Sequence, residues 1–339
     1  MDFGTSYDRL YVAVVLPYKN GTFEPDERQL RALLQTFTRP QYVEAGIGII
    51  INPEAGEVFY LDRATKRRIV ELAAEEVNGK VPLFAGVIDT TTEGTGNVAH
   101  DAMQAGADGL FVMPPMGAGD ITASWNPTRY PEVWIDMVKE TISAAGGDMP
   151  VLCHPTSSIS MAYGNGFPME STVRMCQEIP NIVGWKMTYN YDGYRTVARA
   201  LRQLDRHVGI LAAPGVYFHE NLASRQFDGT VSGSFNYALE PMIDHINAWR
   251  RGDVEEACRI WDGGLSEIHE YVYGDFSRLH IRYKTAAWLR GVISNPFMVP
   301  PMPKPRREEV RTLHRLLSRA GLGVISTEEA ERVAAALQQ

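Results

Sequence analysis

The sequence predicts an α/β fold in which eight parallel strands close into a (β/α)8 TIM barrel with a C-terminal helical extension. Eight short apolar runs recur along the first 240 residues, and amphipathic segments of helical period separate them. No Gly-x-Gly-x-x-Gly turn follows the first run. An open doubly wound sheet would show the same alternation, but the count of eight and the missing glycine turn favour the closed barrel.

The expected strands are short and nearly free of polar residues, as strands buried on both faces of a parallel sheet should be. The clearest cases are Val12–Leu16 and Ile47–Ile51. The eight runs are Leu10–Leu16, Gly46–Ile51, Pro82–Ile88, Gly109–Met113, Pro150–Cys153, Ile182–Met187, Val208–Ala212 and Gly229–Gly233.

Beyond Tyr237 the pattern changes to helices alone. We expect helices at Pro241–Arg250, Val254–Tyr271, Leu279–Val292 and Arg307–Leu322. The five prolines of Pro296–Pro305 indicate a linker before the final helix. The expected division is therefore a barrel over residues 1–240, and over 241–339 the last barrel helix with a helical extension.

Composition limits the possible partners. The 339 residues are 45% hydrophobic and carry a formal charge of -8. This balance disfavours nucleic acid or an anionic membrane, because both require a broad basic face. A small molecule is the expected partner.

The chain also has features of a cytoplasmic protein. Its three cysteines are odd in number and lie in apolar or helical stretches, so a disulfide framework is not expected. The first residues lack a basic segment followed by an apolar one, and no apolar stretch approaches the ~20 residues of a membrane span. We therefore expect an unprocessed protein in a reducing cytoplasm.

Lys186 is the strongest candidate for chemistry. In a barrel of this type the active site lies at the carboxyl ends of the strands, and of seven lysines only Lys186 lies inside an apolar strand. Burial disfavours the ammonium form and leaves a nucleophilic amine that attacks carbonyls. Two alternatives are an ion-paired structural lysine at this position and a functional amine at Lys19, which follows the first strand.

Short motifs in a consistent order along the chain carry a family resemblance. They are the Asn-x-x-x-Gly-Glu turn at Asn52–Glu57, Ala85-Gly86-Val87, Ala105-Gly106-Ala107-Asp108-Gly109, Met113-Pro114-Pro115 and Gly184-Trp185-Lys186. Over about residues 10–292 the chain resembles the dihydrodipicolinate synthase and N-acetylneuraminate lyase family of class I aldolases. The resemblance implies that Lys186 forms a Schiff base with pyruvate or another 2-oxo acid, and it implies a homotetramer or another homo-oligomer.

Two catalytic elements of that family are altered here. The tyrosine that shuttles protons on strand five aligns with His154, and a shift of one residue would select Cys153 instead. Histidine exchanges protons near neutral pH, so we interpret His154 as catalytic, with a structural histidine bonded to a carbonyl as the alternative.

The threonines of strand two, which bind the substrate carboxylate in the family, align with Glu54 and Ala55. An inward Glu54 carboxylate would repel a substrate carboxylate. Either the backbone amides of Ala55 and Gly56 still bind the acid, or the substrate is not a simple 2-oxo acid. Glu54 would alternatively bind a hydroxyl or amine, act as a base, or lie in solvent.

Four further residues complete the expected substrate site. Thr188 follows the lysine strand, and in the family the segment at Gly233 and Ser234 lines the Schiff-base pocket. Pro115 stands where many relatives carry tyrosines that cross a subunit boundary. The surrounding Met-Pro-Pro-Met sequence is similar to that of a hydratase-aldolase branch, in which it would form an apolar pocket wall.

No cofactor and no metal are expected. The eight histidines are scattered, without a His-Glu-x-x-His motif. The resulting hypothesis is a lyase or aldolase in which Lys186 and His154 process a carbonyl substrate by aldol cleavage, condensation or hydration. The alternatives are a repurposed small-molecule-binding barrel that has lost the usual tyrosine and threonines, and a catalyst that uses Lys186 only as an ammonium.

Overall fold

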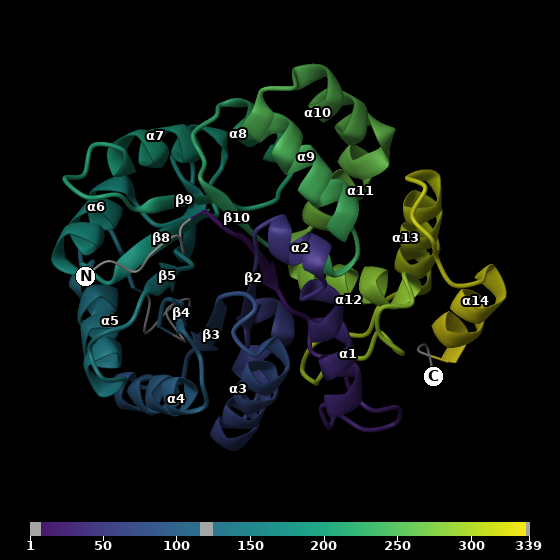
Figure 1. Cartoon of the computed structure of the whole chain (residues 1–339), viewed down its shortest axis with the longest axis horizontal. Coiled ribbons are helices and arrows are strands. Elements are labelled where there is room, and N and C mark those ends of the chain that lie inside the picture. Colours follow the sequence, from purple (N-terminus) through teal and green to yellow (C-terminus); the bar gives the residue numbers. More distant parts are fainter. Residues whose placement is uncertain (1–7, 116–124, 337–339) are drawn as a thin grey trace.

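The computed structural model describes residues 8–115 and 125–336, and within them eight parallel strands form a closed barrel (Figure 1). Around the barrel the order is β1, β10, β9, β8, β5, β4, β3 and β2. Each predicted apolar run contains one strand, which confirms the predicted barrel. The strands are β1 Leu10–Ala13, β2 Ile47–Ile51, β3 Leu83–Val87, β4 Gly109–Val112, β5 Val151–Cys153, β8 Ile182–Met187, β9 Gly209–Ala212 and β10 Gly229–Ser232.

Helices connect the strands and cover the outside of the barrel (Figure 1). Their starts follow local rules: Asp62, for example, accepts a hydrogen bond from the Thr65 amide and so begins α3. The helices of this layer are α1 Glu27–Phe37, α2 Pro40–Glu44, α3 Arg63–Val77, α4 Thr92–Gln104, α5 Glu132–Ala144, α6 Met169–Glu178, α7 Tyr191–Leu201, α8 Phe218–Ala223 and α9 Leu239–Arg251. No helix within residues 8–115 and 125–336 is long and apolar enough to cross a membrane.

The C-terminal extension is helical, as predicted, with two differences in detail. The single helix expected over 254–271 is divided by a π-helical turn, where Gly264 has a φ of 120° and packs against Ala320. A further helix follows the one that was expected to be last. The elements are α10 Val254–Ile260, the π turn Trp261–Leu265, α11 Ser266–Tyr273, α12 Leu279–Leu289, α13 Arg307–Arg319 and α14 Thr327–Ala336. The division at residue 240 stays a prediction.

The connection after β5 contains a hairpin that the sequence patterns did not indicate. Strands β6 Thr156–Ser160 and β7 Gly164–Gly166 pair antiparallel in a separate two-stranded sheet. Gly166 is required here, because a Cβ atom at this position would lie 2.1 Å from the Tyr189 ring. The hairpin is thereby held beside the carboxyl end of β8.

Large side chains fill the interior of the barrel. Tyr11 and Phe84 pack edge to face with ring centroids 5.4 Å apart, and Gly48 leaves the space for the Tyr11 ring. Tyr11 and Phe84 have no exposed surface. Because this part of the barrel is a packed core, a ligand site requires the space above the strand ends.

A buried ion pair joins the barrel to the extension. Glu57, in the turn after β2, lies 2.6 Å from Lys284 of α12, and both side chains are almost completely buried. The second carboxylate oxygen of Glu57 accepts a 2.7 Å hydrogen bond from the Val299 amide in the proline-rich linker. One carboxylate therefore holds both the helix and the linker against the turn.

Substituting one member of this pair should strongly destabilise the protein. We expect Lys284→Met to lower the free energy of unfolding by ~3–5 kcal/mol, because it leaves the Glu57 carboxylate buried without its cation. Lys80→Met, the same replacement at an exposed position, should change it by less than ~0.5 kcal/mol. Urea denaturation of both variants checks this expectation, and a loss below ~1 kcal/mol for Lys284→Met would contradict it.

Candidate active site

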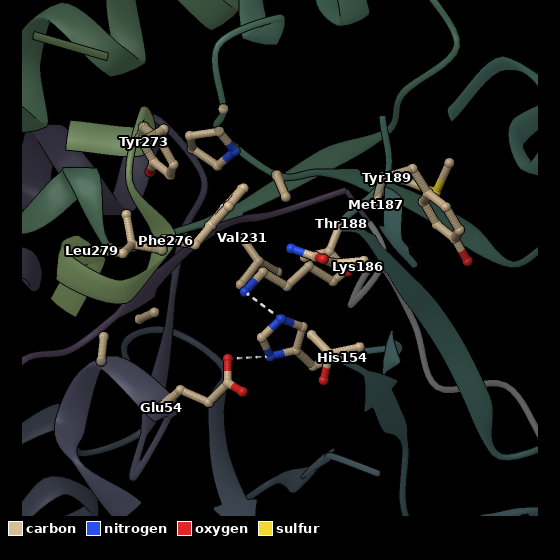
Figure 2. A pocket seen from close by; sticks show the side chains of 18 of the residues that line it. Glu54, His154, Lys186, Met187, Thr188, Tyr189, Val231, Tyr273, Phe276 and Leu279 are labelled. Carbon is tan, nitrogen blue, oxygen red and sulfur yellow. Dashed lines mark hydrogen bonds and ion pairs between the residues drawn. The ribbon is translucent and has the colours of Figure 1, made fainter. Parts of the chain in front are cut away.

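Strand β8 places Lys186 above a layer of leucines. Side chains alternate along a strand, so Gly184 and Lys186 face the same side. A Cβ atom at Gly184 would lie 2.7 Å from Leu152 and 2.9 Å from Leu211, which shows that the space below the lysine is filled. The Lys186 side chain consequently extends into the pocket at the carboxyl ends of the strands (Figure 2).

His154 lies directly after β5 and contacts the lysine. Its backbone amide donates to the Val112 carbonyl, which keeps it in the sheet, and its side chain is buried. The His154 Nε2 atom is 3.1 Å from Lys186 Nζ. Cys153, the neighbouring alternative, is completely buried outside the pocket lining, and burial raises the pKa of its thiol. Of these two residues, the structure places His154 against the amine.

Glu54 reaches the same centre from the turn after β2. Asn52 has a left-handed backbone with a φ of 53°, and its carbonyl lies so close to Gly86 that a Cβ atom there would be 1.8 Å away. The turn continues through Pro53 into a short 3₁₀ helix, Glu54–Gly56. Glu54 Oε2 lies 2.9 Å from His154 Nδ1. Figure 2 shows the resulting chain from carboxylate to imidazole to amine.

Burial and the three neighbouring charges determine the ionisation of this chain. Burial lowers the pKa of Lys186 to about 8, although the Glu54 carboxylate opposes the shift. Burial raises the pKa of Glu54, but His154 and Lys186 outweigh it and lower the pKa to about 2. The pKa of His154 is lowered, mainly by burial. At neutral pH, Glu54 is therefore ionised and His154 is neutral.

This charge state fixes the histidine tautomer. The ionised carboxylate of Glu54, 2.9 Å from Nδ1, favours the tautomer of His154 that carries its proton on Nδ1, so the Nε2 lone pair faces Lys186. With a pKa near 8, about a tenth of Lys186 is unprotonated at pH 7, far more than for an ordinary lysine. The arrangement therefore combines an available amine with a proton acceptor in hydrogen-bond contact.

The pocket around this chain has a volume of about 490 Å³, a size typical of small-molecule sites. Its lining comes from the strand ends, from the β6–β7 hairpin and from the C-terminal extension. The lining includes Ala13, Glu54, Ala55, Phe111, His154, Thr156, Asn165, Lys186, Thr188, Asn190, Pro214, Tyr217, Asn221, Val231, Gly233, Tyr273, Phe276, Leu279, His280 and Tyr283.

Of three predicted substrate-binding residues, two line the pocket and one does not. Ala55 and Thr188 line the pocket. The hydroxyl of Thr188 is buried and has no hydrogen-bond partner among the described residues, which leaves it available to a ligand. Gly56 is not in the lining, and its amide donates to the Pro53 carbonyl at 2.9 Å, so that donor is already used within the turn.

Of the predicted residues after β10 and β4, one lines the pocket and two do not. Gly233 lines the pocket, and its missing side chain leaves room for the ring of Tyr283. Ser234 lies behind the wall, where its hydroxyl bonds to those of Tyr237 and Tyr273 at 2.9 and 2.8 Å. Pro115 is partly buried and not in the lining, and the adjoining Met116 lies outside the described residues.

Five of the lining residues that sequence reasoning missed come from the extension. Tyr273 ends α11, Phe276 lies in the following turn, and Leu279, His280 and Tyr283 belong to α12. Burial lowers the pKa of His280 to about 4, so it is neutral at pH 7. Their only sequence signal is the aromatic and histidine spacing at the start of α12, and nothing in that spacing indicates which face covers the barrel.

Within the described residues, no three histidine, cysteine, aspartate or glutamate side chains are grouped so that they would hold a metal ion. The ionisable groups of the pocket instead form the linear contact of Glu54, His154 and Lys186. An amine beside a proton acceptor is suited to covalent chemistry on a carbonyl group.

Comparison with known proteins agrees with this geometry. The model of the dihydrodipicolinate synthetase family matches residues 6–118 and 137–320. The chain belongs to this family. Its membership confirms the family predicted from the sequence and the prediction of a lyase-type enzyme.

Family relatives match nearly the whole chain at low identity. The 4-hydroxy-tetrahydrodipicolinate synthase of Methanopyrus kandleri is 25% identical over 320 residues, which cover 94% of this chain and 98% of the relative. The putative 2-dehydro-3-deoxy-D-gluconate aldolase YagE of Escherichia coli is 25% identical over 276 residues, covering 80% and 86%.

Solved structures of the family share the fold. The structure of YagE in complex with pyruvate aligns with a TM-score of 0.78 at 20% identity and covers 94% of this chain and 100% of YagE. Dihydrodipicolinate synthase from Aquifex aeolicus aligns with a TM-score of 0.76 at 19% identity and covers 94% and 100%. These likenesses confirm the barrel with its C-terminal helices.

The ionisation of Lys186 provides a direct test of the site. Acylation by a small anhydride, followed by mass spectrometry of the peptides, should give a pH midpoint near 8 for Lys186. Glu54→Gln should move the midpoint to lower pH, because it removes the carboxylate that favours the ammonium form. The exposed Lys80 serves as the internal control. A midpoint for Lys186 that coincides with that of Lys80 would contradict the assigned environment.

Proposed function

We propose that the protein is a cofactor-independent lyase in which Lys186 forms a Schiff base with a carbonyl substrate of the 2-oxo acid type. The observation that carries this proposal is the 3.1 Å contact between Lys186 Nζ and His154 Nε2 inside the pocket. The relative YagE, whose solved structure contains pyruvate, supports the substrate type. Aldol cleavage, aldol addition and hydration all proceed from this intermediate.

His154 is the proposed proton carrier. Neutral Lys186 attacks the carbonyl carbon, a C–N bond forms, and Nε2 of His154 accepts the proton that the nitrogen loses. This proton and a second one taken up from solvent then pass to the former carbonyl oxygen, which leaves as water. The product of this step is an iminium ion, and its positive charge withdraws electrons from the neighbouring carbon.

Glu54 is proposed as a positioning residue, because it acts through His154. The 2.9 Å contact with Nδ1 holds the imidazole in the tautomer whose lone pair faces the amine. Its negative charge also favours the iminium ion over the neutral substrate. This role differs from that of a substrate ligand, since the carboxylate is already paired with His154.

Contacts to the substrate are proposed for two polar groups of the wall. The Thr188 hydroxyl and the Asn221 amide oxygen are buried, line the pocket and have no hydrogen-bond partner within the described residues. Buried polar groups of this kind are stabilised by a ligand that completes their hydrogen bonds. Thr188 lies two residues after the lysine and is suited to donate to the oxygens beside the reacting carbon.

Chemical trapping tests the covalent step. Incubation with pyruvate and then borohydride should add the reduced three-carbon unit to the peptide that contains Lys186, and Lys186→Ala should abolish the adduct. Lys284→Arg, which alters a buried lysine outside the pocket lining and keeps its charge, is the control for general loss of structure. A panel of 2-oxo acids that gives no adduct at Lys186 would refute the proposal and favour a barrel that only binds its ligand.

Replacing the proton carrier tests its role separately from that of the nucleophile. We expect His154→Gln to slow adduct formation by ~10²–10⁴-fold while leaving Lys186 able to react. The double variant Glu54→Thr with His154→Tyr, which introduces the residue types of the family, should form the adduct faster than His154→Tyr alone. Quenched-flow trapping measures both rates. An unchanged rate in His154→Gln would exclude the proposed proton transfer.

A further inference from the structure

The pocket lining includes several exposed apolar side chains. Val216 and Tyr217, in the loop after β9, are 43% and 53% exposed, and Phe276, before α12, is 62% exposed. Leu279 lies beside them in the lining. Of nine strongly exposed large apolar residues in the described chain, three are at this one pocket. Such clustering marks a surface that an apolar ligand group covers.

The position of Phe276 is fixed by its neighbours. Asp275 accepts a 3.0 Å hydrogen bond from the Ser277 amide, which closes the turn on one side. On the other side, the Arg278 guanidinium is buried against Glu309 and also donates to the Lys304 carbonyl. An aromatic ring on so well anchored a turn offers a preformed contact surface at little entropic cost.

The pocket has few groups that would bind a second anionic group. Its described lining contains one lysine, two histidines and one glutamate, and no arginine. The lysine is the proposed nucleophile, the pKa values of both histidines are lowered, and Glu54 is negative. A second carboxylate or a phosphate on the substrate would thus be desolvated without a cation to pair with.

Polar and apolar groups of the pocket lie on different sides of the amine. Figure 2 shows Phe276, Leu279 and Tyr273 on one side of the Lys186 amine, and Thr188 and Tyr189 on the other. Thr156, Asn165 and Asn190 add polar groups to the lining. A substrate bound to Lys186 therefore has one end suited to hydrogen bonding and another end suited to apolar contact.

From this arrangement we infer that the substrate carries an apolar group of the size of an aromatic ring, which lies against Phe276 and Leu279. The inference rests on the proposed Schiff base at Lys186 and specifies the substrate class of that same site. It excludes substrates whose distal end is a carboxylate or a phosphate.

Three 2-oxo acids test the inference through borohydride trapping at Lys186. Pyruvate reports imine formation alone, whereas 4-phenyl-2-oxobutanoate and 2-oxoglutarate share one carbon chain and differ only in a distal phenyl or carboxylate group. We expect the phenyl compound to reach half-saturation at a concentration at least ~10-fold below that of pyruvate, because its ring covers apolar surface. 2-Oxoglutarate should not bind better than pyruvate.

Variants at the pocket mouth test whether Phe276 contacts the phenyl group. Phe276→Ala should raise the half-saturating concentration of the phenyl compound by ~5–10-fold and change that of pyruvate by less than ~2-fold. Phe23→Ala, at an equally exposed phenylalanine outside the pocket lining, should change neither. Phe276→Arg should improve the trapping of 2-oxoglutarate, since it supplies the missing cation.

The outcomes distinguish the two proposals. If none of the three acids forms an adduct, the Schiff-base proposal fails and the inferred substrate class fails with it. If pyruvate forms an adduct but 2-oxoglutarate saturates at a lower concentration than the phenyl compound, only the substrate class is overturned. An unchanged half-saturating concentration of the phenyl compound in Phe276→Ala also overturns it.

Discussion

The contact of Glu54, His154 and Lys186 is the interaction on which the proposed chemistry of this barrel depends. An amine buried alone above a layer of leucines would simply remain neutral, and a buried carboxylate alone would be costly. Together, with an imidazole between them, each group stabilises the next. The carboxylate lies 2.9 Å from Nδ1, and Nε2 is in hydrogen-bond contact with the amine. The three strands that supply them are closed in one barrel, which fixes the distances.

In the proposed mechanism, this arrangement takes over the proton transfer that the family resemblance assigns to a tyrosine. The resemblance places a tyrosine and threonines where His154, Glu54 and Ala55 stand in this chain. Without a fixed tautomer, a histidine would be a poor substitute for the tyrosine, because its proton would be shared between the two ring nitrogens. Glu54 removes that freedom. The two departures from the family pattern, His154 and Glu54, are therefore best interpreted together, because the role of each depends on the other.

The sequence predicted the barrel well because its strands are almost entirely buried on both faces and therefore appear as apolar runs. It missed α14 because that helix buries only the small residues Ala330 and Ala334, which give no apolar stripe. It missed the β6–β7 hairpin because its residues are mostly polar or glycine. Lys186 and His154 were identified from strand ends, whereas Phe276 and His280 reach the pocket only because the extension packs back over the barrel.

The turn after β2 sends two carboxylates in different directions. Glu54 and Glu57 are three residues apart, a spacing that aligns side chains in a 3₁₀ helix, but Glu57 has a left-handed backbone with a φ of 60°. One carboxylate therefore meets the reactive centre and the other meets α12 and the linker. The same turn therefore holds the C-terminal extension through Glu57 and positions His154 through Glu54. Exchanging the C-terminal extension for another would therefore also disturb the groups that are proposed to transfer the proton.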